Sequence, residues 1–472
     1  HGLTAARGYI FDEVYFARFA QDYLTFSECP EFMKEGGYPE DAGCFDVHPP
    51  LGKLLIALGR SFYPHTDFQR QERKESAPAR RQGPKSSAPL PVRFSAQEVL
   101  AWRVLPAAFG VALVFVFYVL GTLLFDDERW GLLAAALASL DTLLLTHSRM
   151  ATLDVFLLFF IGVALAAFLA GERWRARRQA LRFFASRSPR RRHVVGAYVV
   201  AGVGVGLAAG VKVAGFALLG VFLVSGVVRR WGRKRRLLEF GSVWAATLGL
   251  SLAAFVATLY LPRLIFGHPF PWDTDLLSKL SFHVGITARP HGTSPFYVWP
   301  LAGGAVVYYR ELFYNGREAL QSAAFIVATG NPVLWWWSTG ALLTLLGGSC
   351  VRLFRSEENR REIGRLDKGG VALLLAGMVC FWGPWVVVGA FTGRETFLHH
   401  FLPASVFLLL AGAWGLGALW KTGRLFLRIL AVVVVVAFVA GFLYLLPLSV
   451  GGELPPEQLA PRLYLTGVSS PR

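Results

Sequence analysis

Apolar runs dominate this chain and constrain its fold more than any other feature. Ten of them approach or exceed the length that a helix needs to cross a hydrocarbon core about 30 Å thick. With 54% hydrophobic residues, the sequence predicts an all-α integral membrane protein of about ten transmembrane helices rather than a soluble one. The predicted spans are Ala101–Phe125, Leu132–Thr146, Val155–Ala170, Val194–Ala209, Val213–Val228, Leu237–Leu261, Pro332–Val351, Gly369–Phe391, Phe401–Trp420 and Leu425–Leu446.

Basic residues predict the orientation of these spans. The formal net charge is +17, but the arginines gather in short connections between apolar runs, which indicates membrane topology rather than nucleic-acid binding. Counting spans puts all of these connections on one side, which we expect to be cytoplasmic in a multi-pass plasma (inner) membrane protein. The clusters are Arg173–Arg192, Arg229–Arg236, Arg352–Lys368 and the pair Lys421 and Arg424.

The other side then carries the long polar segments. We expect an external loop at 1–100, transmembrane helices at 101–261, a second external loop at 262–331, further helices at 332–447 and an external tail at 448–472. Within the first loop, 67–93 is rich in Pro, Ser, Arg and Gln and is expected to be a flexible insertion. Cys29 and Cys44 bracket a polar stretch and either form a disulfide in an oxidising compartment or stay free.

Two adjacent carboxylates, Asp12 and Glu13, lie near the start of the first external loop. The chain begins at His1 with no basic or apolar leader, so we expect a helix to be missing before it. Taken alone, Asp12 either takes part in chemistry or is a helix N-cap with Glu13 in the first turn. Further on, His48 and Lys53 flank Pro-Pro-Leu-Gly and are candidates to hold a phosphate or carboxylate, with an interfacial helix start and a snorkelling lysine as the alternative.

Four ionisable residues stand inside or between apolar runs, where a charge costs roughly 2.5–3.5 kcal/mol near the bilayer centre. Arg103 opens one span, and its position there favours a functional role. Arg149 and Asp154 open another, and either bind substrate or pair with each other or with neighbouring helices. Lys212 separates two spans and either serves the site or is solvated in a tight turn.

The later external segments add histidines and aromatic residues. His291 lies in a stretch with Arg, Pro, Thr and Trp that suits a sugar face, whereas an interfacial aromatic belt explains Trp335–Trp337 well and His291 poorly. Arg394 and His400 share a further external turn. His399 and His400 are adjacent rather than at the i, i+4 spacing of helical metal ligands, so no metal site is predicted, and metal dependence is left open.

Taken in order, these motifs resemble the protein O-mannosyltransferase family, GT-C glycosyltransferases that use a polyprenyl- or dolichyl-phosphate mannose donor. The resemblance runs along almost the whole chain and rests on the acidic pair, His48-Pro-Pro-Leu-Gly-Lys53, Trp102-Arg103-Val-Leu-Pro-Ala, Ser148-Arg149-Met-Ala-Thr-Leu-Asp154, the Gly206–Lys212 turn, Gly330-Asn-Pro-Val-Leu-Trp-Trp and Arg394–Pro403. It implies eleven helices, one more than the runs counted here. No segment is long enough for the MIR domain of eukaryotic members, which suggests a prokaryotic-type relative.

The resemblance also implies roles. Asp12 would remove a proton from the acceptor hydroxyl in a single displacement that inverts the anomeric carbon, and Glu13 would orient the acceptor or the base. Arg103 would be the main ligand of the donor phosphate, supported by Lys53, Lys212 and Arg394. The remaining candidates for substrate binding are His48, Arg149, Asp154, His291 and His400.

The implied function is mannose transfer from a polyprenyl-phosphate-linked donor to Ser or Thr hydroxyls of secreted proteins at the outer membrane face. The lipid-linked sugar is a substrate, membrane lipids surround the protein, no other cofactor is predicted, and no nucleic-acid partner is expected. One alternative is transfer to a glycolipid such as lipid A. The other is a lipid-linked sugar transporter, which should show inverted repeats that we do not find.

Overall fold

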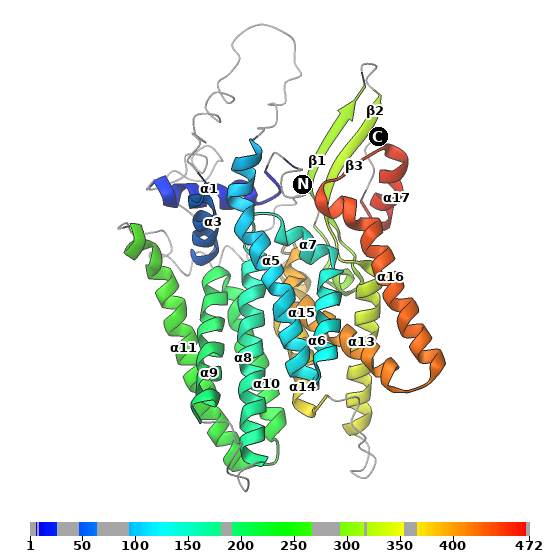
Figure 1. Ribbon diagram of the computed structural model, residues 1–472. Helices are drawn as coiled ribbons and strands as arrows, with labels where there is room; N and C mark the ends of the chain where they lie inside the picture. The colour runs from blue at the N-terminus through cyan, green and yellow to red at the C-terminus, as the bar shows by residue number, and fades with distance from the viewer. Residues whose placement is uncertain are drawn as a thin grey trace.

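The protein is a tall, mostly helical bundle with a small sheet at one end (Figure 1). The computed structural model describes residues 6, 9–25, 47–63, 94–180, 191–266, 293–315, 319–353 and 366–468. Its long helices are α5 (Ala96–Phe125), α6 (Glu128–Ser139), α7 (Thr142–Ser148), α8 (Asp154–Ala180), α9 (Arg191–Val211), α10 (Ala217–Arg230), α11 (Lys234–Phe266), α13 (Pro332–Leu353), α14 (Lys368–Phe391), α15 (Leu402–Lys421) and α16 (Leu425–Val450). The predicted insertion at 67–93, Cys29, Cys44 and His291 lie outside the described residues.

Every apolar run predicted to span a membrane is helical, although Leu132–Thr146 is divided between α6 and α7. Among the described residues, eight helices are long and apolar enough to cross, and a ninth crossing results if α6 and α7 are counted together. Those two helices meet at an angle of 70°. The break occurs because Asp141 caps α7 by accepting a hydrogen bond from the Leu144 backbone N–H, at 2.8 Å.

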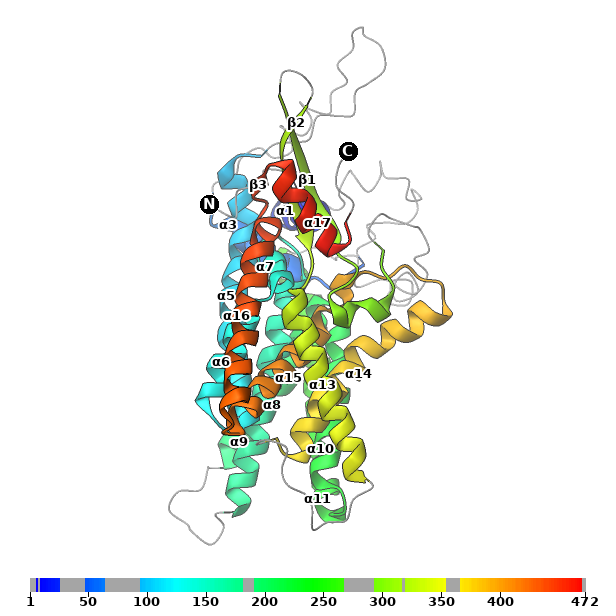
Figure 2. The ribbon, with the colours of Figure 1, turned by 90° about the vertical axis from the view of Figure 1, so that its right-hand side faces the viewer.

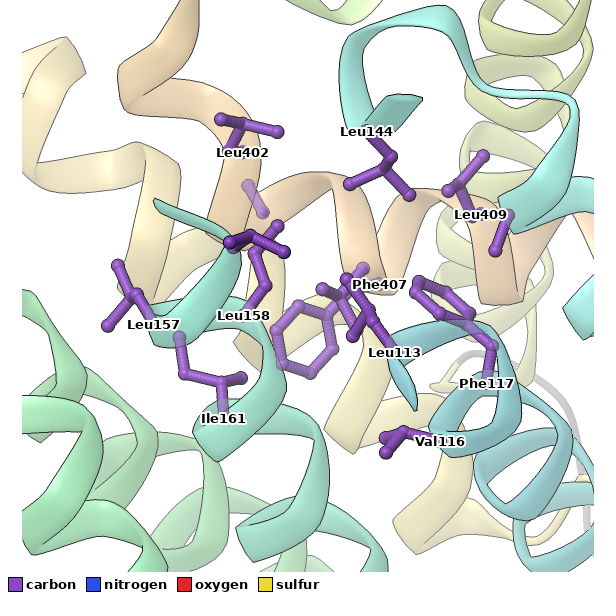
Figure 3. Packing of buried hydrophobic residues seen from close by; sticks show 14 of the residues in the cluster. Leu113, Val116, Phe117, Leu144, Leu157, Leu158, Ile161, Leu402, Phe407 and Leu409 are labelled. Atoms are coloured by element: carbon purple, nitrogen blue, oxygen red, sulfur yellow. The ribbon is translucent and has the colours of Figure 1, made fainter. Parts of the chain in front are cut away.

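Helix packing relies on small residues. Gly202, Gly206 and Gly210 lie four residues apart on α9, and a Cβ atom at any of them would lie within 3.0 Å of an atom of α11. In a membrane such stripes let two helices approach closely and gain dispersion energy. Large side chains fill the centre of the bundle, where Leu113 and Phe117 of α5 pack near Phe407 of α15 (Figure 3).

A three-stranded antiparallel sheet stands beside the bundle, in the order β1 (Val306–Tyr314), β2 (Leu320–Ala328), β3 (Glu453–Leu454). The sequence analysis predicted an all-α fold and expected only an external loop at 262–331 and an external tail at 448–472 here. The central strand β2 is buried along most of its length, and α17 (Pro456–Thr466) covers it with Leu459 and Leu463. The C-terminal tail therefore folds onto the sheet.

The two ends of the bundle differ in composition. The sheet, α17 and the short helices α1 (Glu13–Thr25) and α3 (Leu51–Ser61) gather at one end (Figure 2). The arginine-rich connection between α10 and α11 lies at the opposite end (Figure 1). The short 3₁₀ segments η4 (Val213–Phe216), η6 (Phe296–Leu301) and η8 (Leu398–Phe401) complete the connections.

Candidate active site

A buried ion pair fixes the start of α1. Glu13 is fully buried and accepts two hydrogen bonds from the Arg103 guanidinium, from Nε at 2.7 Å and from Nη2 at 2.6 Å. The backbone N–H groups of Ile10 and Ala151 also donate to Glu13, each at 2.8 Å. Arg103 Nη1 donates a further hydrogen bond to the Ala6 carbonyl, at 2.7 Å. Such a bidentate, fully hydrogen-bonded pair holds its geometry tightly, so the loop before α1 is anchored to α5.

The neighbouring carboxylate, Asp12, is in a different state. Among the described residues, none donates a hydrogen bond to its side chain, which is only partly exposed. Burial raises the pKa of Asp12 to about 7, with the nearby Asp154 adding to the rise and Lys212 opposing it. A carboxylate with such a pKa is basic enough to accept a proton near neutral pH.

The backbone beside Asp12 is strained and held from two sides. Phe11 has a φ of 49°, which is uncommon for a residue with a side chain. Its backbone N–H donates to the Tyr308 carbonyl at 3.0 Å, and its ring stacks on the Tyr308 ring with centroids 4.2 Å apart. Strand β1 thereby helps to hold Asp12 in place, and backbone strain of this kind often accompanies functional sites.

A polar network runs next to Asp12. The Lys212 ammonium lies 2.7 Å from Asp154 Oδ1, and His147 Nδ1 lies 3.5 Å from Asp154 Oδ2. The other ring nitrogen of His147 shares a hydrogen bond of 3.1 Å with the Tyr308 hydroxyl, which lies 3.4 Å from His399 Nδ1. Burial raises the pKa of Tyr308 well above its ordinary value, so this hydroxyl keeps its proton. The network joins α7, α8, β1 and η8 into one site.

Arg394 provides a cation close to this network. It is 9% exposed, its guanidinium stacks on the Trp385 ring at 4.9 Å, and its Nε is buried with no hydrogen-bond partner among the described residues. His399 lies within electrostatic range of Arg394, Lys212 and Asp154. Burial lowers the pKa of Arg394 to about 10, which leaves the guanidinium charged at neutral pH.

His400 shares the same aromatic support. Its ring stacks on Trp385 with centroids 3.7 Å apart, and its Nδ1 accepts a hydrogen bond from the Phe397 backbone N–H at 3.2 Å. The two contacts fix the orientation of the turn that carries Arg394. Trp385 therefore positions both residues from α14.

The other predicted cations are already engaged. Lys53 is fully buried, donates to the His48 carbonyl at 2.6 Å and lies 5.2 Å from the Phe19 ring centroid. Arg149 donates to the Ser449 carbonyl at 3.0 Å, which links the end of α7 to the end of α16. Arg149 does not form the ion pair with Asp154 that was one alternative, because Asp154 pairs with Lys212.

The structure thus brings together five predicted residues, Asp12, Asp154, Lys212, Arg394 and His400. Glu13 and Arg103 form an ion pair with each other. His147, Tyr308 and His399 were not among the predicted site residues. His147 directly precedes the Ser148-Arg149 motif, which was a usable signal. Tyr308 lies in Val-Val-Tyr-Tyr, a β-branched and aromatic stretch that is typical of a strand.

Metal ligation has no obvious place in the part of the chain that the structure describes. Within it, no three His, Cys, Asp or Glu side chains group as metal ligands would. Next to Asp12, Asp154 pairs with Lys212 and His147, and His147 and His399 lie against the Tyr308 hydroxyl.

Comparison with known proteins identifies the family. Residues 1–278 match the family model described as dolichyl-phosphate-mannose-protein mannosyltransferase, and residues 277–466 match the C-terminal four-transmembrane region of protein O-mannosyltransferase. The chain belongs to the protein O-mannosyltransferase family. This membership makes it a membrane glycosyltransferase and confirms the family predicted from the ordered motifs.

Bacterial relatives match this mannosyltransferase along most of their length. A polyprenol-phosphate-mannose–protein mannosyltransferase from Corynebacterium glutamicum is 23% identical over 89% of this chain and 80% of its own. One of the same name from Mycobacterium tuberculosis is 24% identical over 95% of this chain and 84% of its own. The similarity therefore extends well beyond single motifs.

Solved structures show the same fold. The Saccharomyces cerevisiae protein O-mannosyltransferase Pmt1-Pmt2 complex bound to the sugar donor superposes with a TM-score of 0.70 at 14% identity, over 100% of this chain and 90% of that one. The Archaeoglobus fulgidus oligosaccharyltransferase reaches 0.52 at 14% identity, over 94% of this chain and 51% of its own. The mannosyltransferase is thus a helical integral membrane protein with the GT-C fold, as predicted.

Proposed function

We propose that this enzyme transfers mannose from a polyprenyl-phosphate-mannose donor to Ser or Thr hydroxyls of secreted proteins. Family membership supports the class of reaction, and the names of the bacterial relatives support this donor and a protein acceptor. The observation that carries the proposal is Asp12, a carboxylate without a described hydrogen-bond donor and with a pKa of about 7, beside Lys212.

Asp12 is the general base of this reaction. It takes the proton of the acceptor hydroxyl while the hydroxyl oxygen forms a bond to the anomeric carbon of mannose. The bond between that carbon and the phosphate oxygen breaks, and the lipid phosphate leaves with the electron pair. One displacement inverts the anomeric carbon. Because phosphate is a good leaving group, the site needs only a placed base and cations around the phosphate.

Arg394 and Lys212 hold the donor phosphate in this scheme. Arg394 is a buried cation beside the network, its Nε has no hydrogen-bond partner among the described residues, and a guanidinium suits phosphate geometry. Arg103 and Glu13 act instead as positioning residues, since their mutual pair leaves Asp12 as the available carboxylate. Lys53 and His48 support the loop that leads into α3, and Arg149 supports the wall at Ser449.

The sidedness of the reaction follows from charge. The end of the bundle opposite the site carries the arginine-rich connection between α10 and α11, and such connections stay in the cytoplasm. We therefore place the site on the external, periplasmic side of the inner membrane. This placement fits an acceptor that has been secreted before it is glycosylated.

The test is transfer of radiolabelled mannose in liposomes that contain the purified full-length protein. Polyprenyl-phosphate-mannose is offered with Ser- and Thr-containing peptides and, separately, with lipid extracts. We expect label on the peptides, and a loss of about 10²- to 10⁴-fold in Asp12→Asn, the usual contribution of a general base. Label confined to lipid would overturn the protein acceptor.

The matched control is Glu457→Gln, which removes an exposed carboxylate from α17 at the same end of the molecule. It should transfer mannose like the unmodified protein. Circular dichroism and thermal unfolding show whether Asp12→Asn stays folded. Undiminished transfer by a folded Asp12→Asn protein would overturn Asp12 as the base.

A further inference from the structure

A cavity of about 920 Å³ opens at the end of the bundle away from Asp12. Its walls come from the last turns of α8 and α10, the first turn of α11, the end of α13 and the beginning of α14. The catalytic network does not reach it, since none of its lining residues belongs to that network. The cavity is therefore a separate feature of the molecule.

Charge in this cavity is strongly unbalanced. Six basic side chains and two carboxylates line it, which leaves a formal excess of four positive charges. The two carboxylates are Glu172 and Asp367. The basic residues are Arg175, Arg229, Arg230, Arg233, Arg236 and Lys368.

Half of these cations are engaged within the protein. Arg230 Nη2 lies 2.8 Å from Glu172, Arg175 pairs with Glu239 at 3.0 Å, and Arg229 pairs with Asp367. These pairs satisfy both carboxylates that line the cavity among the described residues, so neither of them is left to neutralise the other cations.

The other half have no such partner. Arg233, Arg236 and Lys368 are exposed, and none of them forms an ion pair with another described residue. They face a common cavity from two helices, α11 and α14, and from the connection before α11. Three uncommitted cations around one cavity are the arrangement that binds an anionic group.

The remaining wall is apolar. Val228, Val371 and Leu375 line the same cavity, and Trp231 is 79% exposed beside it. An exposed tryptophan at a helix end is typical of the level at which membrane meets water. A ligand that suits both parts of the wall has an anionic head and a hydrocarbon tail.

We infer that this cavity binds an anionic phospholipid from the cytoplasmic leaflet, with its headgroup phosphate among Arg233, Arg236 and Lys368 and its acyl chain against Val228 and Leu375. The cavity lies at the arginine-rich end, where acidic lipids are attracted by basic side chains. Bound there, the lipid bridges α8, α10, α11 and α14. The inference does not rest on the proposed mannose transfer.

The exposed Trp231 provides the measurement. The full-length protein is placed in phosphatidylcholine vesicles that contain a fixed fraction of brominated phosphatidylglycerol or, in a parallel sample, brominated phosphatidylcholine. Bromine quenches tryptophan fluorescence on contact, and subtracting the signal of Trp231→Phe isolates the contribution of Trp231. We expect stronger quenching by phosphatidylglycerol, with an apparent affinity about tenfold or more above that of phosphatidylcholine.

Two triple variants separate the cavity from general surface charge. Arg233→Gln/Arg236→Gln/Lys368→Gln should abolish the preference for phosphatidylglycerol. The control Lys234→Gln/Arg235→Gln/Arg424→Gln removes the same three charges from residues that do not line the cavity, and it should retain the preference. Equal quenching by the two lipids, or equal loss in both variants, would overturn the inference.

An arm with inorganic phosphate at constant ionic strength distinguishes a lipid from a free anion. Excess phosphate should leave the lipid preference in place, and its loss would mean that the cavity takes a soluble anion. Mannose transfer is measured on the same samples. If the unmodified protein prefers phosphatidylglycerol as expected but transfers no mannose, the result contradicts the proposed function and leaves the lipid inference in place.

Discussion

Buried carboxylates at the two ends of the bundle differ in how completely they are paired. At the arginine-rich end, Glu172 accepts hydrogen bonds from Arg230 Nη2 at 2.8 and 2.9 Å and a further one from the Tyr198 hydroxyl. At the site end, Glu13 is satisfied in the same way by Arg103. Its neighbour Asp12 is not.

The difference separates architecture from chemistry. A buried charge is costly unless it is paired and hydrogen-bonded, and Glu172 and Glu13 meet that requirement in full. The Asp12 side chain has no hydrogen-bond donor among the described residues, and burial raises its pKa, so this carboxylate can accept a proton near neutral pH. Two adjacent acidic residues therefore serve opposite purposes, because only one of them lies within reach of a guanidinium.

The largest expected effect comes from breaking the two buried pairs. Glu13→Gln and Glu172→Gln should each lower the free energy of unfolding by about 3–5 kcal/mol, since each leaves a buried arginine without its carboxylate. Thermal unfolding in detergent measures the loss. Mannose transfer per folded molecule should fall for Glu13→Gln, which releases the Asp12 turn, and stay unchanged for Glu172→Gln.

The double variant Glu13→Gln/Arg103→Met sharpens this result. It should regain stability relative to Glu13→Gln alone, because no uncompensated charge is left. A variant Arg103→Met that keeps its full stability and raises the KM for the donor would show instead that Arg103 binds phosphate, as the sequence analysis expected.

Arg394 should have the next largest effect. Arg394→Gln removes a charged donor to the phosphate, a contribution of about 1.5–3 kcal/mol, so the KM for the lipid donor should rise about 10- to 100-fold. The control is Arg462→Gln, whose guanidinium stacks on Tyr444 and donates to its carbonyl at the same end of the protein. An equal rise in both variants would contradict a specific role for Arg394.

The pH dependence of transfer tests the raised pKa of Asp12. As pH rises through about 7, Asp12 loses its proton and becomes the active base, so kcat/KM should increase and then level off. Lys212 stabilises the charged carboxylate, so Lys212→Gln should move the midpoint to higher pH. A midpoint that stays in place in this variant would argue against an electrostatic interaction between Asp12 and Lys212.

The smallest expected effect is that of Tyr308→Phe. It keeps the ring that stacks on Phe11 and removes the hydroxyl that joins His147 to His399, at a cost of about 0.5–1.5 kcal/mol. Transfer should therefore fall only a few-fold. Tyr308→Ala also removes the stacking that supports Asp12 and should be far more harmful, and equal losses in the two variants would contradict this division of roles.

The sequence by itself determined the membrane character of the chain. Long apolar runs are unfavourable in water, and in lipid they must form helices because the backbone polar groups need internal hydrogen bonds. All ten predicted spans are helical in the structure. The same reasoning marked Arg103, Arg149, Asp154 and Lys212, since an ionisable group in such surroundings needs an explanation. The ordered motifs also predicted the family, which the family models confirmed.

Only the tertiary structure determined which charged side chains pair with each other. Arg103 could be assigned to a phosphate from the sequence, but its partner Glu13 lies 90 positions away along the chain. Tyr308 reaches the site on β1, which pairs with β2, and β2 is covered by α17 at the far end of the chain. The local sequence shows where a charged group will be buried at a cost in free energy. The hydrogen-bonding atoms that offset this free energy come from helices and strands that are distant in sequence.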